Sequence, residues 1–512
     1  MAAAGAATGV NRIAATACVM LATLMQSLDT TIANVALPHI QGSVSATQDQ
    51  IAWVLTSYIV AAAIMTPPTG FLASRFGLKR LFLVSVAGFT VASMLCGAAQ
   101  SLVEIVLFRV MQGMFGAALV PLSQTVLLNI NPKERQGSAM ALWGVAVMVG
   151  PILGPVLGGW LTDNYTWRYV FYINLPIGIL AFLGMIAFLP NSPPNAGEKL
   201  DWFGFGTLSL AIGALQVLLD RGEQLDWFGS REILIEAVIA ASAFYLFLAH
   251  TFTAEKPFLR PALFRDRNFA AGVIFIAIVG LTYYASLALQ PTYLQDLLNY
   301  PVVTAGLVVG PQGVGTMAAM LIVGRLIGRV DTRLLLAIGL ALTAWAFHVI
   351  TSWTPDVSQA TIIGNGLIQG FGLGFLFVPL SAVTLSTLSP EMRAEGAGFF
   401  NLSRNIGSSI GISVVNSLLT QNTQINHADI ARHVTAVNRD FADPIITQFW
   451  NPATAAGRAA LDAMITQQAQ IIAYIDDYKL LMIATLVAIP LLIVFTRPPR
   501  GPAADHAGAM EM

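Results

Sequence analysis

Two charged residues interrupt long apolar runs. Asp29 lies in a run from about residue 13 to about residue 37, and Arg109 lies in another from 103 to 127. An ionised carboxylate near the centre of a membrane-spanning helix costs about 2.5–3.5 kcal/mol, so its presence suggests a use. Desolvation favours the protonated carboxyl group, and a nearby cation favours the ionised one. Movement of Arg109 could therefore make Asp29 bind and release a proton. The alternative is a static ion pair that fixes two helices.

Further polar residues lie deep in apolar runs and are candidates for the lining of a central cavity. Each alone is more often a helix–helix hydrogen-bonding residue than a ligand contact. Arg404 is the exception, because an intramembrane arginine normally faces the bundle interior or water and could attract an anion. The candidates are Asn34, Gln112, Tyr283, Tyr284, Gln290, Gln312, Asn365, Gln369, Asn401, Arg404 and Asn405.

A glycine appears at every fourth position of the segment GPILGPVLGGW, residues 150–160. Gly150, Gly154 and Gly158 therefore line one helical face and allow a neighbouring backbone to approach closely. Pro151 and Pro155 remove hydrogen bonds and favour bending, and Gly159 adds a further small residue. We interpret the segment as a pivot between two halves of the protein. Ordinary small-residue packing is the alternative.

The composition indicates lipid as the solvent for the helices that carry these residues. Hydrophobic residues make up 56% of the 512 residues, only 10% are charged, and the mean hydropathy is +0.70. Soluble domains carry about 25% charged residues. A net charge of -1 leaves no basic surplus for nucleic acid. The chain is thus predicted to be an all-α integral membrane protein that binds no nucleic acid.

Fourteen runs have the length of about 20 residues that a bilayer requires. The first run is too long for a signal peptide, and we interpret it as an uncleaved span. The predicted spans are 13–36, 51–73, 80–99, 103–127, 138–161, 168–189, 203–219, 231–252, 269–290, 302–323, 334–352, 359–384, 396–419 and 478–496.

Lys and Arg residues set the expected orientation. The turns 38–50, 291–301 and 353–358 contain neither residue, whereas the turns on the opposite side are rich in both. Positively charged turns remain in the cytoplasm, so both termini are predicted to be cytoplasmic.

The segment 421–477 is different from the other external turns, because it is long, polar and rich in Gln and Asn. It is either a small helical hairpin over the outer mouth or a loosely ordered loop.

The chain contains an internal repeat. Gln112-Gly113 and Val120-Pro121-Leu122-Ser123 recur as Gln369-Gly370 and Val378-Pro379-Leu380-Ser381, and the turn 70–80 has a counterpart at 324–333. An offset of about 255 residues gives two six-helix halves with two helices inserted between them. The expected divisions are a first bundle at 1–190, inserted helices at 200–253, a cytoplasmic linker at 254–268, a second bundle at 269–496 and a tail at 497–512.

Seven segments in order carry a family resemblance: LDTTIANVALP (28–38), GFLASRFGLKR (70–80), LFRVMQGMFGAAL (107–119), GPILGPVLGGW (150–160), WRYVFYINLPIG (167–178), LDRGEQLDWF (219–228) and LFRDRNF (263–269). Over nearly its whole length the chain resembles the major facilitator superfamily, and within it the fourteen-span EmrB/QacA drug:proton antiporters, with closer similarity to the EmrB type.

The resemblance assigns a gating role to the cytoplasmic turn through Gly70, Arg75, Gly77, Lys79 and Arg80. The family turn commonly reads GxLADRxGRK. Here Ser74 replaces the acidic residue and Leu78 replaces the second basic residue, which excludes an ion pair centred on residue 74.

The resemblance implies a proton-coupled antiporter that exports hydrophobic drugs or toxic compounds across the bacterial inner membrane by alternating access, with Asp29 and Arg109 in proton coupling and the 150–160 segment as the antiporter motif. It also implies a periplasmic adaptor and an outer-membrane channel as partners, with segment 421–477 as the contact. An exporter of an endogenous metabolite, siderophore or fatty acid is the alternative.

Spans 302–323 and 396–419 contain no Asp or Glu, which favours neutral or weakly acidic substrates over dications. A nutrient importer fits the fold but not the 150–160 segment. The sequence contains no HExxH or Walker A pattern, and its histidines have no metal spacing, so we expect neither an enzyme nor a cofactor or metal site.

Overall fold

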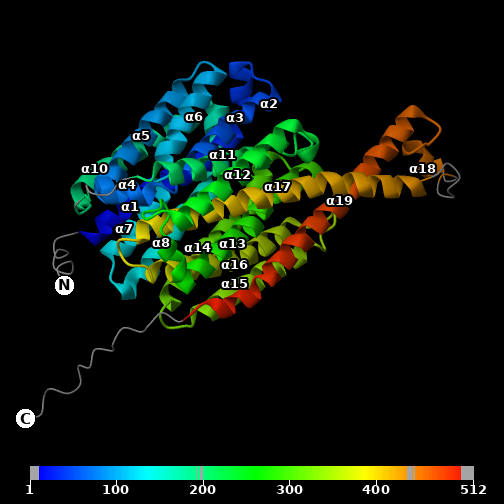
Figure 1. Cartoon of the computed structure of the whole chain (residues 1–512). Coiled ribbons are helices and arrows are strands. Elements are labelled where there is room, and N and C mark those ends of the chain that lie inside the picture. Colours follow the sequence, from blue (N-terminus) through cyan, green and yellow to red (C-terminus); the bar gives the residue numbers. More distant parts are fainter. Residues whose placement is uncertain (1–10, 193, 196–199, 435–440, 442–443, 497–512) are drawn as a thin grey trace, which may run out of the picture.

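Apolar runs that cross lipid form helices because a helix satisfies its own backbone hydrogen bonds. In the computed structural model, long helices lie side by side in a bundle, and a helical hairpin protrudes from one end (Figure 1). The structure describes residues 11–192, 194–195, 200–434, 441 and 444–496. The predicted tail at 497–512 lies outside these residues.

The first bundle contains the predicted spans one to six. Pro67 and Pro68 separate α3 from α4, which meet at 58° and form one bent span. The helices are α1 (Arg12–Val44), α2 (Gln48–Ile51), α3 (Trp53–Met65), α4 (Thr69–Phe76), α5 (Leu78–Ala98), α6 (Leu102–Gly116), α7 (Leu119–Ile130), α8 (Lys133–Asn164), α9 (Tyr169–Tyr172) and α10 (Asn174–Phe188).

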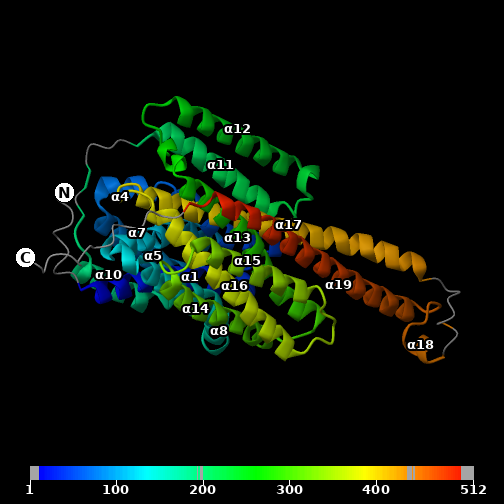
Figure 2. The same cartoon turned by 90° about the horizontal axis from the view of Figure 1, so that it is seen from below.

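Two inserted helices follow, α11 (Trp202–Arg221) and α12 (Arg231–Thr253), which lie together along one side of the molecule (Figure 2). Helix α11 packs against α3 of the first bundle and α17 of the second, and α12 packs on α11. Gln216 of α11 exchanges hydrogen bonds with Ser409 of α17. The inserted pair therefore joins the two bundles at their side.

The second bundle contains the last six predicted spans. It consists of α13 (Arg267–Thr292), the π-helical turn η3 (Tyr293–Leu297), α14 (Val302–Leu326), α15 (Thr332–Ile350), α16 (Gln359–Ser386), α17 (Arg393–His433), and α19 (Ala455–Val487) with the 3-10 turn η5 (Ile489–Val494).

Among the described residues, twelve helices are long and apolar enough to cross a membrane, and the bent pair of α3 and α4 makes a thirteenth. Helix α17 does not pass the same test. It carries Asn401, Arg404 and Asn405, but it lies in the bundle against α13 and α19. The structure is thus consistent with fourteen spans.

The segment 421–477 is the helical hairpin of the two predicted alternatives, and it is longer than expected. Helix α17 continues out of the bundle, α18 (Pro444–Phe449) lies near the tip, and α19 returns (Figures 1 and 2). His427 Nε2 of α17 lies 2.9 Å from Asp462 Oδ1 of α19, so the two helices are paired well beyond the bundle.

The internal repeat is visible at the end of the molecule opposite the hairpin. Gly77 and Gly328 occupy equivalent turns, and both have a φ of +87°, a conformation that glycine adopts without strain. Gly70 lies directly against Glu395 of α17, and its counterpart Gly324 lies against Ala141 of α8. Each turn therefore contacts the other bundle.

Candidate functional site

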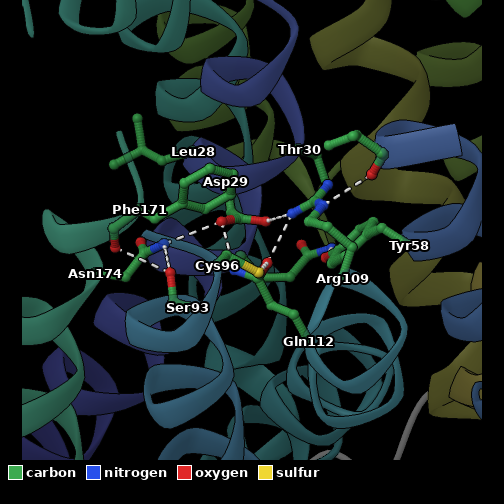
Figure 3. A network of polar contacts seen from close by, with 12 residues as sticks. Leu28, Asp29, Thr30, Tyr58, Ser93, Cys96, Arg109, Gln112, Phe171 and Asn174 are labelled. Carbon is green, nitrogen blue, oxygen red and sulfur yellow. Dashed lines mark hydrogen bonds and ion pairs between the residues drawn. The ribbon is translucent and has the colours of Figure 1, made fainter. Parts of the chain in front are cut away.

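Asp29 lies at the centre of a polar network inside the first bundle (Figure 3). Its Oδ2 accepts a hydrogen bond of 2.8 Å from Arg109 Nη1, and its Oδ1 accepts from Gln112 Nε2 at 2.7 Å and from Asn174 Nδ2 at 3.0 Å. Asp29 is fully buried, and Arg109 is 1% exposed. Hydrogen bonds from a cation to an ionised carboxylate are the strong kind in a water-poor interior.

Arg109 is held from several sides. Its Nε donates to the backbone oxygen of Val54 at 3.0 Å, and its Nη1 also donates to Gln112 Oε1 at 2.8 Å. The guanidinium carbon lies 4.1 Å from the centroid of the Tyr58 ring. A cation above an aromatic face is attracted by the ring quadrupole. Helices α1, α3 and α6 therefore all position one ion pair.

The structure brings together Asp29 and Arg109 as the sequence predicts, and it adds residues that sequence reasoning missed. Asn174 also donates to Ser93 Oγ at 2.9 Å, and Ser93 donates to the backbone oxygen of Phe171. Asn174 and Phe171 belong to the segment WRYVFYINLPIG, which was the available signal. Gln112, predicted to line a substrate cavity, instead binds both members of the ion pair.

This arrangement can exchange a proton only if it rearranges. In the observed state Asp29 accepts hydrogen bonds from three side chains and is fully buried. Withdrawal of Arg109 would leave a buried carboxylate without its cation, a state that favours proton uptake. A conformational change that separates α1 from α6 would give the ion pair a second, unpaired state.

The predicted cavity residues of the second bundle are mostly buried and only partly bonded. Gln369 Nε2 donates to Ser286 Oγ at 2.8 Å, and Asn401 Nδ2 donates to Gln124 Oε1 of the first bundle at 2.7 Å. The remaining positions vary in exposure. Tyr283, Gln290, Gln312 and Asn365 are buried, and Tyr284 and Asn405 are half-buried. Asn34, the predicted cavity residue on α1 of the first bundle, is exposed.

Arg404 is buried but incompletely bonded. It is 9% exposed, and its Nε and Nη1 have no hydrogen-bond partner among the described residues. Nη2 donates to Asn405 Oδ1 at 3.2 Å, and the guanidinium lies 6.0 Å from the Phe377 ring. Two donors are thus available for an anionic group.

A cavity of about 800 Å³ lies at the end where the gating turn meets the second bundle, and none of the predicted cavity residues lines it. Its lining includes Gly70, Ser74, Asp201, Lys256, Glu391 and Glu395.

The glycines of α8, which are predicted to form a pivot between the two halves, face α1 of the same bundle rather than the second bundle. A Cβ on Gly150 would lie 2.4 Å from the backbone oxygen of Ser27, and one on Gly154 would lie 2.1 Å from Thr31 Oγ1. Gly158 approaches Ile32 in the same way, whereas Gly159 faces open space. The side chains of Pro151 and Pro155 lie outside the described residues. The small residues therefore set how closely α8 approaches the helix that carries Asp29.

Helix α8 does reach the second bundle, but through other residues. Gly144 lies against Met320 of α14, and Ile152 lies against Gly313 of α14. Trp143 stacks on Phe377 of α16 at 5.6 Å between ring centroids. One face of α8 thus contacts the second bundle, and the glycine face contacts α1.

Replacing Gly150 by alanine is expected to reduce transport severely, because the added carbon overlaps the backbone of Ser27 and must push α1 away from α8. Overpacking of this kind costs about 1–3 kcal/mol. Uptake into inverted membrane vesicles and the thermal unfolding midpoint in detergent would measure both effects. Gly159→Ala is the matched control and should behave as wild type; equal behaviour of the two variants would contradict the proposed close packing.

The predicted gating turn lies at the junction of the bundles. A Cβ on Gly70 would lie 2.5 Å from Glu395 Cα of α17. Lys79 Nζ donates to the backbone oxygens of Ile186 and Leu189 and so caps the end of α10. Gly77 provides the left-handed turn. Arg75 is half-buried, and Arg80 is exposed.

Further contacts join the bundles near this turn. Arg393 Nη1 of α17 donates to Asn129 Oδ1 of α7 at 3.0 Å, and Ser138 Oγ of α8 donates to the backbone oxygen of Gly324 at 3.3 Å. The bundles are therefore closed against each other at the end opposite the hairpin.

Comparison with known proteins shows which family shares this architecture. A model of the Major Facilitator Superfamily matches residues 19–412. The chain is 35% identical over 505 residues to the multidrug export protein EmrB of Escherichia coli K12, with 98% of each chain covered. It is also 35% identical to the fatty acid resistance protein FarB of Neisseria gonorrhoeae, covering 94% of this chain and 95% of FarB.

A solved structure agrees in fold. The human organic anion transporter MFSD10 matches with a TM-score of 0.61 at 15% identity, covering 94% of this chain and 99% of that one. The chain is thus a multi-pass membrane transporter and not an enzyme. Taken together, the two-bundle fold, the family match and the full-length relatives show that the chain belongs to the Major Facilitator Superfamily, in the group that includes EmrB.

Proposed function

We propose that this chain is a proton-driven antiporter that exports hydrophobic compounds across the bacterial inner membrane. The buried ion pair of Asp29 and Arg109, with Gln112 and Asn174 bound to the same carboxylate, is the observation that supports this most. The similarity to the multidrug export protein EmrB supports the export direction. Asp29 would bind a proton from outside, and its release inside would drive the cycle.

Proton binding would act on transport by changing which side of the membrane the substrate path is open to. The two bundles would rock about the cavity between them, and the observed contacts at the gating turn would close the cytoplasmic side. The hairpin end would then face the periplasm, with both termini in the cytoplasm. Protonation of Asp29 would free Arg109 and bias the equilibrium between the two openings.

The proposed substrates are hydrophobic and neutral or weakly acidic. Arg404 offers two unbonded donors in a buried position, and spans 302–323 and 396–419 carry no carboxylate to bind a dication. Transport of an endogenous fatty acid or similar metabolite is the second candidate, and the similarity to the fatty acid resistance protein FarB favours it specifically.

The function can be tested with a fluorescent hydrophobic weak acid and inverted vesicles under an imposed proton gradient. We expect accumulation that collapses when the gradient is removed, and less accumulation of a divalent quaternary-ammonium probe. Gradient-independent uptake would contradict the proposal, and a preference for the dication would contradict the substrate class.

We also propose that the hairpin contacts a periplasmic adaptor, which in turn joins an outer-membrane channel. Paired helices that extend beyond the bundle provide a long surface for a helical partner.

Replacing residues 426–465 by a short Gly/Ser linker is expected to spare transport in vesicles and to remove resistance in intact cells, because only the cell requires passage through the outer membrane. Drug susceptibility and vesicle uptake would be measured on the same variant. Equal loss in both measurements would contradict an adaptor role.

A further inference from the structure

A second carboxylate is buried in the described part of the chain, far along the sequence from Asp29. Asp477 of α19 is 1% exposed, and neither of its oxygens has a hydrogen-bond partner. The preceding residue, Asp476, differs from it in exposure and in bonding. Asp476 is 43% exposed and forms an exposed ion pair with Lys479 at 3.1 Å. The proton-coupling residues described above do not contact Asp477.

Asp477 lies where the protruding hairpin enters the bundle. The preceding part of α19 pairs with α17, as the contact between His427 and Asp462 shows. Tyr474, about one turn earlier on α19, and Tyr478, the residue directly after Asp477, belong to an apolar cluster with Tyr293, Phe347 and Trp353. The rings of Tyr474 and Tyr293 lie 5.3 Å apart, and those of Tyr478 and Phe347 lie 6.1 Å apart. The carboxyl group therefore lies among packed aromatic residues.

The groups around this position offer no cation to the carboxylate. Among the described residues, no Lys, Arg or His forms an ion pair with Asp477, and the nearby Lys479 is paired with Asp476. The elements around Asp477 carry several titratable or charged groups near the end of the bundle where the hairpin enters. They are Tyr283 and Tyr284 of α13, Tyr293 and Asp296 of η3, His348 of α15, His427 of α17, and Tyr474, Asp476, Tyr478 and Lys479 of α19.

An isolated ionised carboxylate in such an interior is so costly that the group takes up a proton instead. Asp29 and Asp477 are both buried, but they differ in their hydrogen-bond partners. Asp29 receives three hydrogen bonds, one of them from a guanidinium, whereas Asp477 receives none. Two carboxyl groups whose surroundings favour opposite protonation states are suited to hold protons at different stages of one cycle.

We propose that Asp477 is a second proton-binding site of the transporter. It holds a proton in the conformation seen here and releases it to water when α19 separates from α17, which leaves an ionised and hydrated carboxylate. The proton rebinds to a carboxylate oxygen when the helices close again. The inference rests on the proposed function of proton-driven export, and it adds a site in the second bundle to the Asp29 site in the first.

The test uses the full chain reconstituted in lipid and two readouts. Infrared spectroscopy across a pH series near neutrality reports the band of protonated carboxyl groups. We expect wild type to show a band that Asp477→Asn loses, and the control Asp476→Asn to keep it, because Asp476 forms an ion pair with Lys479 outside the aromatic cluster. The second readout is the number of protons exchanged per substrate, which should be lower in Asp477→Asn than in wild type.

An unchanged band or an unchanged proton count in Asp477→Asn would overturn the proposal. If that variant does not fold, Asp477→Glu should keep the band at a shifted frequency, and its absence would have the same meaning. Failure of the proposed function is distinguishable, since wild type would then move substrate without protons, whereas failure of this inference leaves wild-type coupling intact.

Discussion

Replacing Asp29 by asparagine is expected to reduce gradient-driven uptake to the level of vesicles that lack the transporter. Asparagine has nearly the size of aspartate and can still accept hydrogen bonds from Gln112 or Asn174, but it cannot bind and release a proton. The protein should therefore fold while the coupling is lost. Uptake of a fluorescent weak acid into inverted vesicles measures the effect.

Asp163→Asn is the control for this variant, because Asp163 is an exposed carboxylate at the far end of α8. It should transport as wild type does. If Asp29→Asn retained full proton-driven transport at normal expression, the ion pair would have only a structural role.

Replacing Arg109 by glutamine is expected to have the largest effect on stability. The change leaves the fully buried Asp29 without its cation, and breaking a buried ion pair in this way costs about 3–5 kcal/mol. Gln112 and Asn174 still donate to the carboxylate, but they do not supply a compensating charge. The midpoint of thermal unfolding in detergent should therefore fall.

A double-mutant cycle separates the charge from the packing. Asp29→Asn combined with Arg109→Gln removes both charges and should recover much of the lost stability. Arg80→Gln, at an exposed position, should change little and serves as control. If the double variant were as unstable as Arg109→Gln alone, the uncompensated carboxylate would not be the cause.

The ion pair could be predicted from sequence because charged residues inside apolar runs are rare and costly. Asn174 and Ser93 could not be assigned to it in the same way. Such neutral polar residues are common in membrane helices, and their contribution depends on how α5 and α10 are rotated toward α1. The partners of a charge thus require the packing of helices, which a single sequence does not specify.

The helices themselves were predictable because each apolar run is long enough to cross lipid. Which helices lie next to each other could not be predicted. The spacing of Gly150, Gly154 and Gly158 correctly indicated a face of close approach, but it did not say which helix approaches. That helix is α1, within the same bundle.

Asp477 was not predicted as a buried residue, because it lies just outside the boundary of the last predicted span. The predicted last span begins at 478, so Asp477 was assigned to a polar external segment. In the structure α19 is one continuous helix across this boundary, it packs against α13, α15 and α17, and Asp477 is buried. A polar stretch beside a span can therefore be buried when a neighbouring helix continues alongside it.

The most direct test of the central claim is to record proton and substrate movement together in liposomes that contain only this protein. Wild type should move protons opposite to a hydrophobic weak acid, with each flux dependent on the other. Asp29→Asn should abolish the coupling. Substrate movement in wild type without any counter-movement of protons would contradict the account.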